Sequence, residues 1–152
     1  MSMEKLIVDN KKSYYDYYIE DKFQAGIALV GSEVKSIRKG AVNLKDSYVR
    51  VKDGEVFLMG AHISRYEKAD TLNKIDERRT RKLLLKKAEI NKLMRAVKIK
   101  GYTIVPTKMY LLDNFVKLEI ALAKGKELHN KKEAIREKDL KREAERTLKN
   151  YK

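Results

Sequence analysis

The dipeptide Asp53-Gly54 lies between two runs in which apolar and polar residues alternate, 48–52 and 55–59. Asp-Gly tolerates the positive φ angles of a type I′ turn, and alternation with period two is typical of a half-buried strand. The segment therefore predicts a β-hairpin. It is the clearest local signal in the chain, and it makes antiparallel strands the starting point for the fold.

A second pair of strands is predicted near the end of the apolar part of the chain. The segments 102–112 and 115–123 are both rich in strand-forming residues, and Asp113-Asn114 separates them as a turn. Apolar residues occupy alternate positions in the second segment, from Val116 to Leu122. Pro106 cannot donate a backbone hydrogen bond, so it favours an edge or a bulge in the first segment.

The remaining segments predict further strands with helices between them. Residues 14–19 have strong β propensity, and 25–31 read as a buried strand. A short helix is expected to start at Ser32 and to end at Gly40. Apolar spacing predicts a long helix over 81–101, whereas the polar segment 64–80 is expected to be a loop.

Together these elements predict a mainly β fold, namely a small, closed or nearly closed antiparallel barrel with about two to three added helices. We expect a flexible lead-in at residues 1–13, the barrel at 14–124, and a basic tail at 125–152. The tail carries acid-to-base pairs four residues apart, but its apolar stripe is thin. We expect it to be disordered when free and helical when bound, and a permanently formed solvated helix remains the alternative.

The charge of the chain points to polyanionic partners. Lys and Arg number 36 against 22 Asp and Glu, which gives a formal net charge of +14. Nucleic acid and anionic membrane are the obvious candidates, and the narrow, weakly apolar face of the tail argues against a membrane partner. The chain has no cysteine, and its start lacks the apolar region of a signal peptide. We expect a cytoplasmic protein without a membrane-spanning segment.

The sequence shows no catalytic or metal-binding pattern. The two histidines, His62 and His129, lack the spacing of a metal site or a triad, and no Gly-rich phosphate loop is present. The carboxylates show no nuclease-like cluster. We therefore expect no enzyme activity, no metal and no cofactor, although an RNA-processing enzyme with an unrecognised site stays open as the alternative function.

Clusters of cations and an unusual number of tyrosines favour RNA. Cations neutralise phosphates and aromatic faces stack on bases, while no recognition-helix motif for a DNA groove is evident. For any single cluster, an ordinary solvated surface explains the charges equally well. The three clusters are Lys35, Arg38 and Lys39; Arg78, Arg79, Arg81, Lys82, Lys86 and Lys87; and Lys124 with Lys126.

Three stretches of the chain share a distinctive set of motifs: "AGIALVGSEVKSIRKGAVNLKDSYVRVKDGEVFLMGAHIS", "RRTRKLLLKKAEINKL" and "VKLEIALAKGKELHNKK". These stretches resemble SmpB, the SsrA-binding protein family of bacteria. The resemblance implies an oligonucleotide-binding-like (OB-fold-like) barrel that cradles the tRNA-like end of transfer-messenger RNA (tmRNA, or SsrA RNA), with the protein bound as a monomer. It also implies a role in trans-translation, the rescue of stalled ribosomes, in which the tail enters the empty decoding site and mRNA channel.

The resemblance also assigns residues to these roles. The tail residues Gly125, His129, Asn130, Lys131 and Lys132 would meet decoding-centre rRNA of the small ribosomal subunit, where Asn130 and Lys132 depart from the usual motif. Arg65 also departs from the pattern, and Gln24 stands where the family often has glutamate. The predicted RNA-binding surface consists of Asn10, Lys11, Gln24, Lys35, Ser36, Arg38, Tyr48, Arg79, Arg81, Lys82, Leu84, Lys124 and Lys126.

Overall fold

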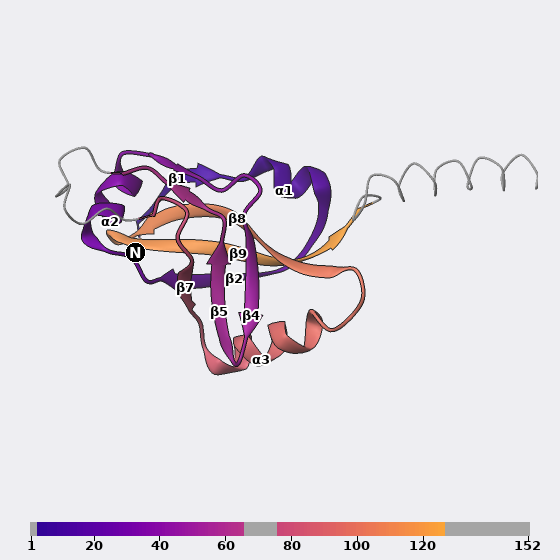
Figure 1. The fold of residues 1–152 in the computed structure, drawn as a ribbon. Coiled ribbons are helices and arrows are strands. Elements are labelled where there is room, and N and C mark those ends of the chain that lie inside the picture. Colours follow the sequence, from indigo (N-terminus) through magenta and orange to yellow (C-terminus); the bar gives the residue numbers. More distant parts are fainter. Residues whose placement is uncertain (1–2, 66–75, 127–152) are drawn as a thin grey trace, which may run out of the picture.

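The computed structural model describes residues 3–65 and 76–126, which contain nine strands and three helices (Figure 1). None of these helices is long and apolar enough to cross a bilayer. The elements in chain order are β1 (Glu4–Asp9), α1 (Lys11–Asp16), β2 (Tyr17–Ile27), α2 (Gly31–Arg38), β3 (Val42–Asn43), β4 (Tyr48–Lys52), β5 (Glu55–Met59), β6 (His62–Ile63), β7 (Arg81–Leu84), α3 (Lys87–Ala96), β8 (Tyr102–Leu112) and β9 (Phe115–Gly125).

Six of the strands close into an antiparallel barrel. The sheet runs in the order β1-β8-β4-β5-β7-β2-β9, and β9 pairs back onto β8, so the ring closes with β1 as an extra strand beside β8. Closure removes most of the free strand edges that an open sheet would expose. The predicted fold class, a mainly β barrel with two to three added helices, is confirmed.

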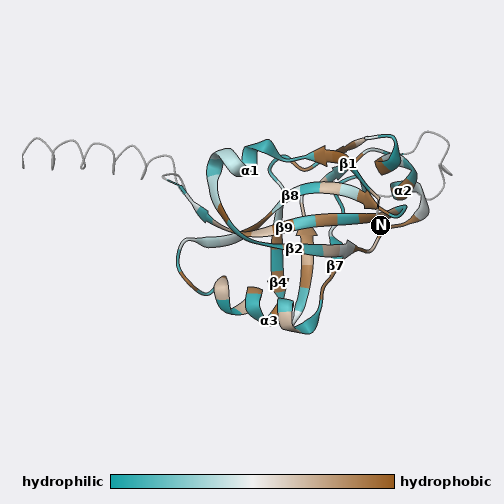
Figure 2. Ribbon diagram, turned by 180° about the vertical axis from the view of Figure 1, so that it is seen from behind, coloured by the Kyte–Doolittle hydropathy of each residue, from teal (hydrophilic) through white to brown (hydrophobic). Residues whose placement is uncertain are grey.

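The core fills the inside of this ring. Leu58, Ile104, Leu118 and Ile120 have no exposed surface, and Leu93 of α3 closes one end of the barrel. Brown and teal alternate along β9 in Figure 2, as expected for a strand with one face toward the core. From Ile120 to Ala123 every residue of β9 is buried, so both faces of the strand are covered there.

Both predicted hairpins are confirmed. Asp53 and Gly54 have positive φ angles of 52° and 76°, and they join β4 to β5. Asp113 and Asn114, with φ angles of 48° and 72°, join β8 to β9. The register of the second hairpin shifts just after Pro106, where a bulge was predicted.

The prediction of a flexible lead-in over 1–13 is wrong for the described residues. Glu4–Asp9 form β1, which pairs with the C-terminal end of β8 and places Leu6 opposite Tyr110. The prediction of a strand over 14–19 is also wrong at its start, since α1 includes Tyr14 and Tyr15. The carbonyl of Asn10 accepts hydrogen bonds from both the backbone and the hydroxyl of Ser13, which turns the chain into a helix there.

The predicted helix over 81–101 divides into a strand and a shorter helix. Residues Arg81–Leu84 form β7 between β5 and β2, and α3 begins only at Lys87. Leu83 lies one heptad before Ile90 and fits the helical apolar spacing, but it is a core residue of β7. The short helix at 31–38 is confirmed, with Val30 in place of Ser32 as its N-terminal cap.

The barrel extends slightly further toward the C-terminus than predicted. Gly125 is the last residue of β9 and pairs with Tyr17, and the backbone N–H of Lys126 donates to the carbonyl of Asp16. The boundary predicted at 125 is therefore too early. The predictions about the tail itself, including those for 129–132, concern residues outside the described ranges.

Candidate nucleic-acid interface

One of the predicted cations is the centre of a buried ionic network. Arg81 has no exposed surface, although it belongs to the most basic stretch of the sequence. Its Nε and Nη2 donate to Glu33 Oε2 at 2.8 and 2.6 Å, and its remaining donors reach the carbonyls of Ala61 (2.9 Å) and Glu77 (3.0 Å). Arg79 Nε donates to the same carboxylate oxygen at 3.1 Å.

This network fastens α2 to β7. Glu33 also accepts a hydrogen bond from the backbone of Val30 (3.1 Å), the N-terminal cap of α2. Burial by itself would raise the pKa of Glu33, but the hydrogen bonds from Arg79 and Arg81 outweigh it and hold that pKa below its usual value. The carboxylate is thus stabilised in its charged form by two guanidinium groups.

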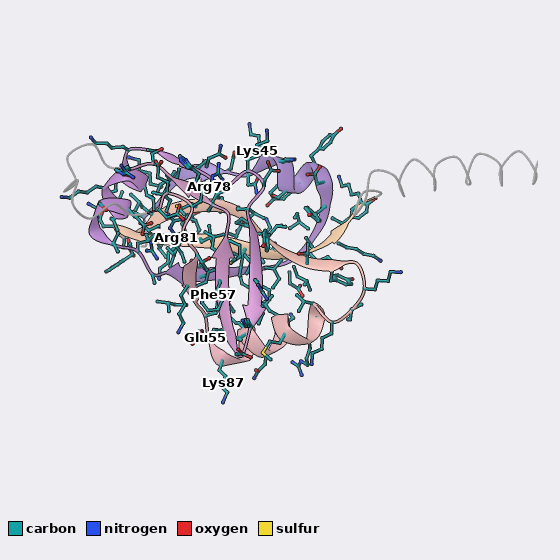
Figure 3. All side chains as sticks on the ribbon, in the orientation of Figure 1. Lys45, Glu55, Phe57, Arg78, Arg81 and Lys87 are labelled. Atoms are coloured by element: carbon teal, nitrogen blue, oxygen red, sulfur yellow. The ribbon has the colours of Figure 1, made fainter. Side chains whose placement is uncertain are left out.

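The structure does not support Arg81, labelled in Figure 3, as an RNA contact, because its side chain is buried and its guanidinium donates to Glu33 and to the carbonyls of Ala61 and Glu77. Two other predicted residues are also buried. Ser36 is on the buried face of α2, and the Asn10 amide donates to the carbonyls of Pro106 (2.9 Å) and Leu44 (3.4 Å). Asn10 thereby joins α1 to the wall of the barrel and positions its neighbours.

A groove with an apolar floor and cationic rim lies beside β7; we call it the Leu84 groove. Leu84 lines it together with Gly26, Arg38, Phe115 and Lys117. More than half of the Leu84 surface is exposed, although composition alone predicts a core residue. A Cβ atom at Gly26 would stand 3.3 Å from the Leu84 Cβ, so glycine lets β2 and the leucine approach closely.

Two predicted residues flank the Leu84 groove. The Arg38 Nη2 reaches the carbonyl of Asn114 at 3.3 Å, which holds the guanidinium over the β8–β9 turn. Gln24 lies two residues before Gly26 on the same strand and accepts a hydrogen bond from the Tyr110 hydroxyl at 2.7 Å. A neutral amide therefore occupies the position where the family pattern often has a carboxylate.

A second groove lies between α1 and the start of β4; we call it the Tyr48 groove. Tyr48, Tyr17, Lys12 and Asp46 are among its lining residues, and about half of the Tyr48 surface is exposed. Lys12 and Asp46 form an exposed ion pair of 2.6 Å across its mouth. Lys11, which was also predicted, is exposed on α1 beside this groove.

The cations at the end of β9 lie against tyrosine rings. The Lys124 Nζ is 5.9 Å from the centre of the Tyr102 ring, and the Lys126 Nζ is 5.3 Å from that of Tyr18. Such contacts hold a lysine beside an aromatic face while its charge stays near water. Because Lys126 also bonds to Asp16 of α1, these cations adjoin the element that forms one wall of the Tyr48 groove.

The fold thus gathers most of the exposed predicted residues around two grooves. Lys35 and Lys82 are exposed on α2 and β7, the elements that also supply Arg38 and Leu84. Sequence reasoning missed Phe115 and Lys117, because their proximity to Leu84 arises only from the pairing of β9 with β2. The His62 Nε2 lies 3.5 Å from the Glu77 Oε2, so His62 has a carboxylate neighbour that the sequence did not indicate.

The described residues contain no group of three or more His, Asp or Glu side chains placed to hold a metal ion. Their polar surface instead combines exposed cations with tyrosines and an exposed leucine around two grooves. The fold and these grooves define a small basic β-barrel protein of the kind that binds nucleic-acid phosphates and bases. Comparison with known proteins then gives the family.

The model of the SmpB protein family matches residues 7–150, and the chain belongs to this family. It is 55% identical over 145 residues to an SsrA-binding protein of Thermoanaerobacter pseudethanolicus, covering 95% of this chain and 92% of the relative. An SsrA-binding protein of Caldicellulosiruptor saccharolyticus is 52% identical over 147 residues, which cover 97% and 92% of the two chains.

A solved structure described as "tmRNA-SmpB: a journey to the center of the bacterial ribosome" contains a chain with the same fold. It superimposes with a TM-score of 0.67 at 41% sequence identity, and the alignment covers 85% of this chain and 94% of that one. The family resemblance drawn from the sequence motifs is confirmed.

Proposed function

We propose that the protein binds the tRNA-like part of tmRNA (SsrA RNA) and delivers it to stalled ribosomes for trans-translation. The observation that carries the proposal is the family membership, with relatives called SsrA-binding proteins that align over nearly the full length. The solved structure described as tmRNA-SmpB adds a structural relative at 41% identity. The cationic rims of the two grooves supply the charge that such a ligand requires.

The proposed contact surface differs from the predicted one. We assign the exposed residues Lys11, Lys35, Arg38 and Lys82 to phosphates, and Tyr48 and Leu84 to bases or sugars, because these types suit those partners. Gln24 would offer an amide where an acid would repel phosphate. Arg79, Lys124 and Lys126 remain candidates, whereas Asn10, Ser36 and Arg81 would act by positioning α1, α2 and β7.

A binding assay tests this proposal. We expect the protein to bind a tmRNA transcript more tightly than an unrelated RNA of equal length. The log–log slope of affinity against salt should be roughly −0.7 to −0.9 per phosphate neutralised. Purification from cells followed by sequencing of the bound RNA should recover tmRNA. Equal affinity for both RNAs would refute the proposal.

The tail extends the proposal to the ribosome. Residues 127–152 would enter the vacant decoding site and mRNA channel, with His129, Asn130, Lys131 and Lys132 near the rRNA of the small ribosomal subunit. Deletion of 129–152 should leave tmRNA binding nearly intact and abolish tagging of nascent peptides. His129→Ala should reduce tagging more than ribosome association, because a methyl group cannot stack on a base. A tail-less protein that still supports tagging would contradict this assignment.

We further propose that the protein is an adaptor without catalytic activity that works in the cytoplasm, where ribosomes translate, and that it binds the RNA as a monomer. An RNA-processing enzyme is the alternative. Incubation of the protein with tmRNA and divalent metal separates the two, because an adaptor leaves the RNA intact and an enzyme shortens it.

A further inference from the structure

Three residues on neighbouring strands form a row across the outside of the barrel. Arg50 of β4 lies directly opposite Phe57 of β5, and Phe57 lies directly opposite Lys82 of β7. Side chains directly opposite each other share a face, with Cβ atoms about 4.5–5.5 Å apart. We call these three residues the Phe57 row.

The row faces outward because its chain neighbours face inward. Val49, Val56 and Leu83 are core residues with at most 5% exposure, and side chains alternate between the two faces of a strand. Figure 3 shows Phe57 on β5 at the front of the molecule, with Glu55 below it at the start of the strand. Arg50 is exposed and Phe57 is half-buried.

The Phe57 row is basic, and no cation of the described residues lies over the Phe57 ring. Within residues 3–65 and 76–126, Arg50 makes no ion pair, and none of the cation–π contacts involves Phe57. Lys82 lies 3.3 Å from Glu55, but both side chains remain about half exposed. A partly exposed aromatic ring with a cation on either side suits a nucleotide, which offers a base to the ring and phosphates to the cations.

The row also connects the two grooves. Tyr48 lies two residues before Arg50 on β4, and Leu84 lies two residues after Lys82 on β7, so both share the outer face with the row. Tyr48 lines one groove and Leu84 lines the other. A strand of RNA that contacts both grooves over this face would cross the Phe57 row.

We infer that the Phe57 row binds an unpaired stretch of RNA, with a base stacked on Phe57 and adjacent phosphates on Arg50 and Lys82. The inference rests on the proposed function for the identity of the RNA, and it adds Arg50 and Phe57 to the contact surface. An unpaired stretch is required because a base in a helix keeps its faces stacked on its neighbours. An acidic protein segment would use the two cations but would leave the ring without a role.

Four variants of the full-length protein test the inference with a tmRNA transcript over a series of salt concentrations. Phe57→Leu keeps an apolar side chain and removes the ring, and Phe57→Tyr restores a ring. Arg50→Gln removes one charge from the row, and Lys5→Gln removes one exposed charge from β1 as the matched control. Thermal unfolding identifies any variant whose fold is damaged.

Each variant has its own expected signature. Phe57→Leu should weaken binding about fivefold or more at every salt concentration with an unchanged slope, since stacking is insensitive to counterion release. Phe57→Tyr should bind as the wild type does. Arg50→Gln should reduce the magnitude of the salt slope by roughly 0.7 to 0.9, the contribution of one phosphate. Lys5→Gln should change neither quantity.

The inference is overturned if Arg50→Gln and Phe57→Leu match Lys5→Gln in affinity and slope while the wild type prefers tmRNA. It is also overturned if these variants bind tmRNA normally and lose only ribosome association, which would assign the row to a ribosomal partner. If Phe57→Leu does not fold, the slope for Arg50→Gln decides. If the wild type binds tmRNA and an unrelated RNA of equal length equally well, the proposed function is refuted instead. The salt slopes of Arg50→Gln and Lys5→Gln, measured with that RNA, still show whether the Phe57 row binds RNA.

Discussion

Arg81 and Lys82 are neighbours on β7, yet they face opposite sides of the barrel wall and serve different purposes. Arg81 has no exposed surface and its guanidinium is held by Glu33 at 2.6 Å. Lys82 is about half exposed, and so is its partner Glu55, whose Oε1 lies 3.3 Å from the Lys82 Nζ. Two adjacent cations in one basic stretch therefore divide into a structural residue and a surface residue, because side chains alternate along a strand.

The environment also sets the energetic weight of each pair. Removing one partner of a buried pair leaves an uncompensated charge in the interior, whereas an exposed pair is screened by water and salt. We therefore expect changes around Arg81 to act on folding and changes around Lys82 to act on RNA binding. The following experiments test this division, beginning with the largest effect.

The buried network should dominate stability. Glu33→Gln should lower the free energy of unfolding by about 3–5 kcal/mol, because it leaves the buried Arg81 guanidinium without a counter-charge. Arg81→Gln should also destabilise the fold, because it leaves the buried Glu33 carboxylate with Arg79 as its remaining cation. Urea denaturation followed by circular dichroism measures the loss. Lys82→Gln is the matched control, with an expected change within about 0.5 kcal/mol. If Arg81→Gln unfolds at the same urea concentration as Lys82→Gln, the division between the two residues is wrong.

The same network should make stability depend on acid. The pKa of Glu33 is lower in the folded protein than its ordinary value, so its contribution is fully present above the unfolded pKa of about 4.3. That contribution should be lost as the pH falls through the lower, folded pKa. Unfolding free energies measured at decreasing pH should therefore fall more steeply in the wild type than in Glu33→Gln. Parallel profiles for the two proteins would show that Glu33 carries no such contribution.

Local signals predicted much of this fold, and pairings over long sequence distances explain what they missed. Asp53-Gly54 and Asp113-Asn114 specify their turns through their own φ angles, so both hairpins could be read from the chain. The strand β7 spans only four residues, too few for its alternation to outweigh the helical spacing of the apolar residues from Ile90 to Val97. β1 exists only through its pairing with β8, about a hundred residues away.

The candidate site was predictable to a similar extent. Motifs named the right elements, since α2, β7 and the end of β9 do carry exposed cations. They did not separate Arg81 from Lys82, because the burial of Arg81 depends on Glu33, which is 48 residues away. Leu84 is the opposite case, because a leucine in an apolar run is exposed. It becomes recognisable as a groove residue only when the fold brings Gly26 and Phe115 beside it.

The exposed cations should affect RNA affinity and leave stability nearly unchanged. Lys82→Gln and Arg38→Gln should each weaken tmRNA binding about fivefold at physiological salt, the counterion-release gain of one phosphate contact. Titration of labelled tmRNA measures the affinity, and the effect should shrink as salt rises. Lys5→Gln on β1 serves as the charge-matched control. An equal loss for Lys5→Gln would mean that net charge, rather than position, governs binding.

The smallest effect distinguishes the two carboxylates. Glu55→Gln removes the acid beside Lys82, as Glu33→Gln removes the acid beside Arg81. Glu33→Gln should lower stability, whereas Glu55→Gln should strengthen RNA binding. Because the Glu55–Lys82 pair is exposed, its loss costs little stability, while Lys82 becomes available to a phosphate without competition. We expect tmRNA to bind about twofold more tightly, the lower part of the range for an exposed pair. Glu55→Asp keeps the charge and should bind as the wild type does. Weaker RNA binding by Glu55→Gln would show that the carboxylate positions Lys82 for RNA rather than competing for it.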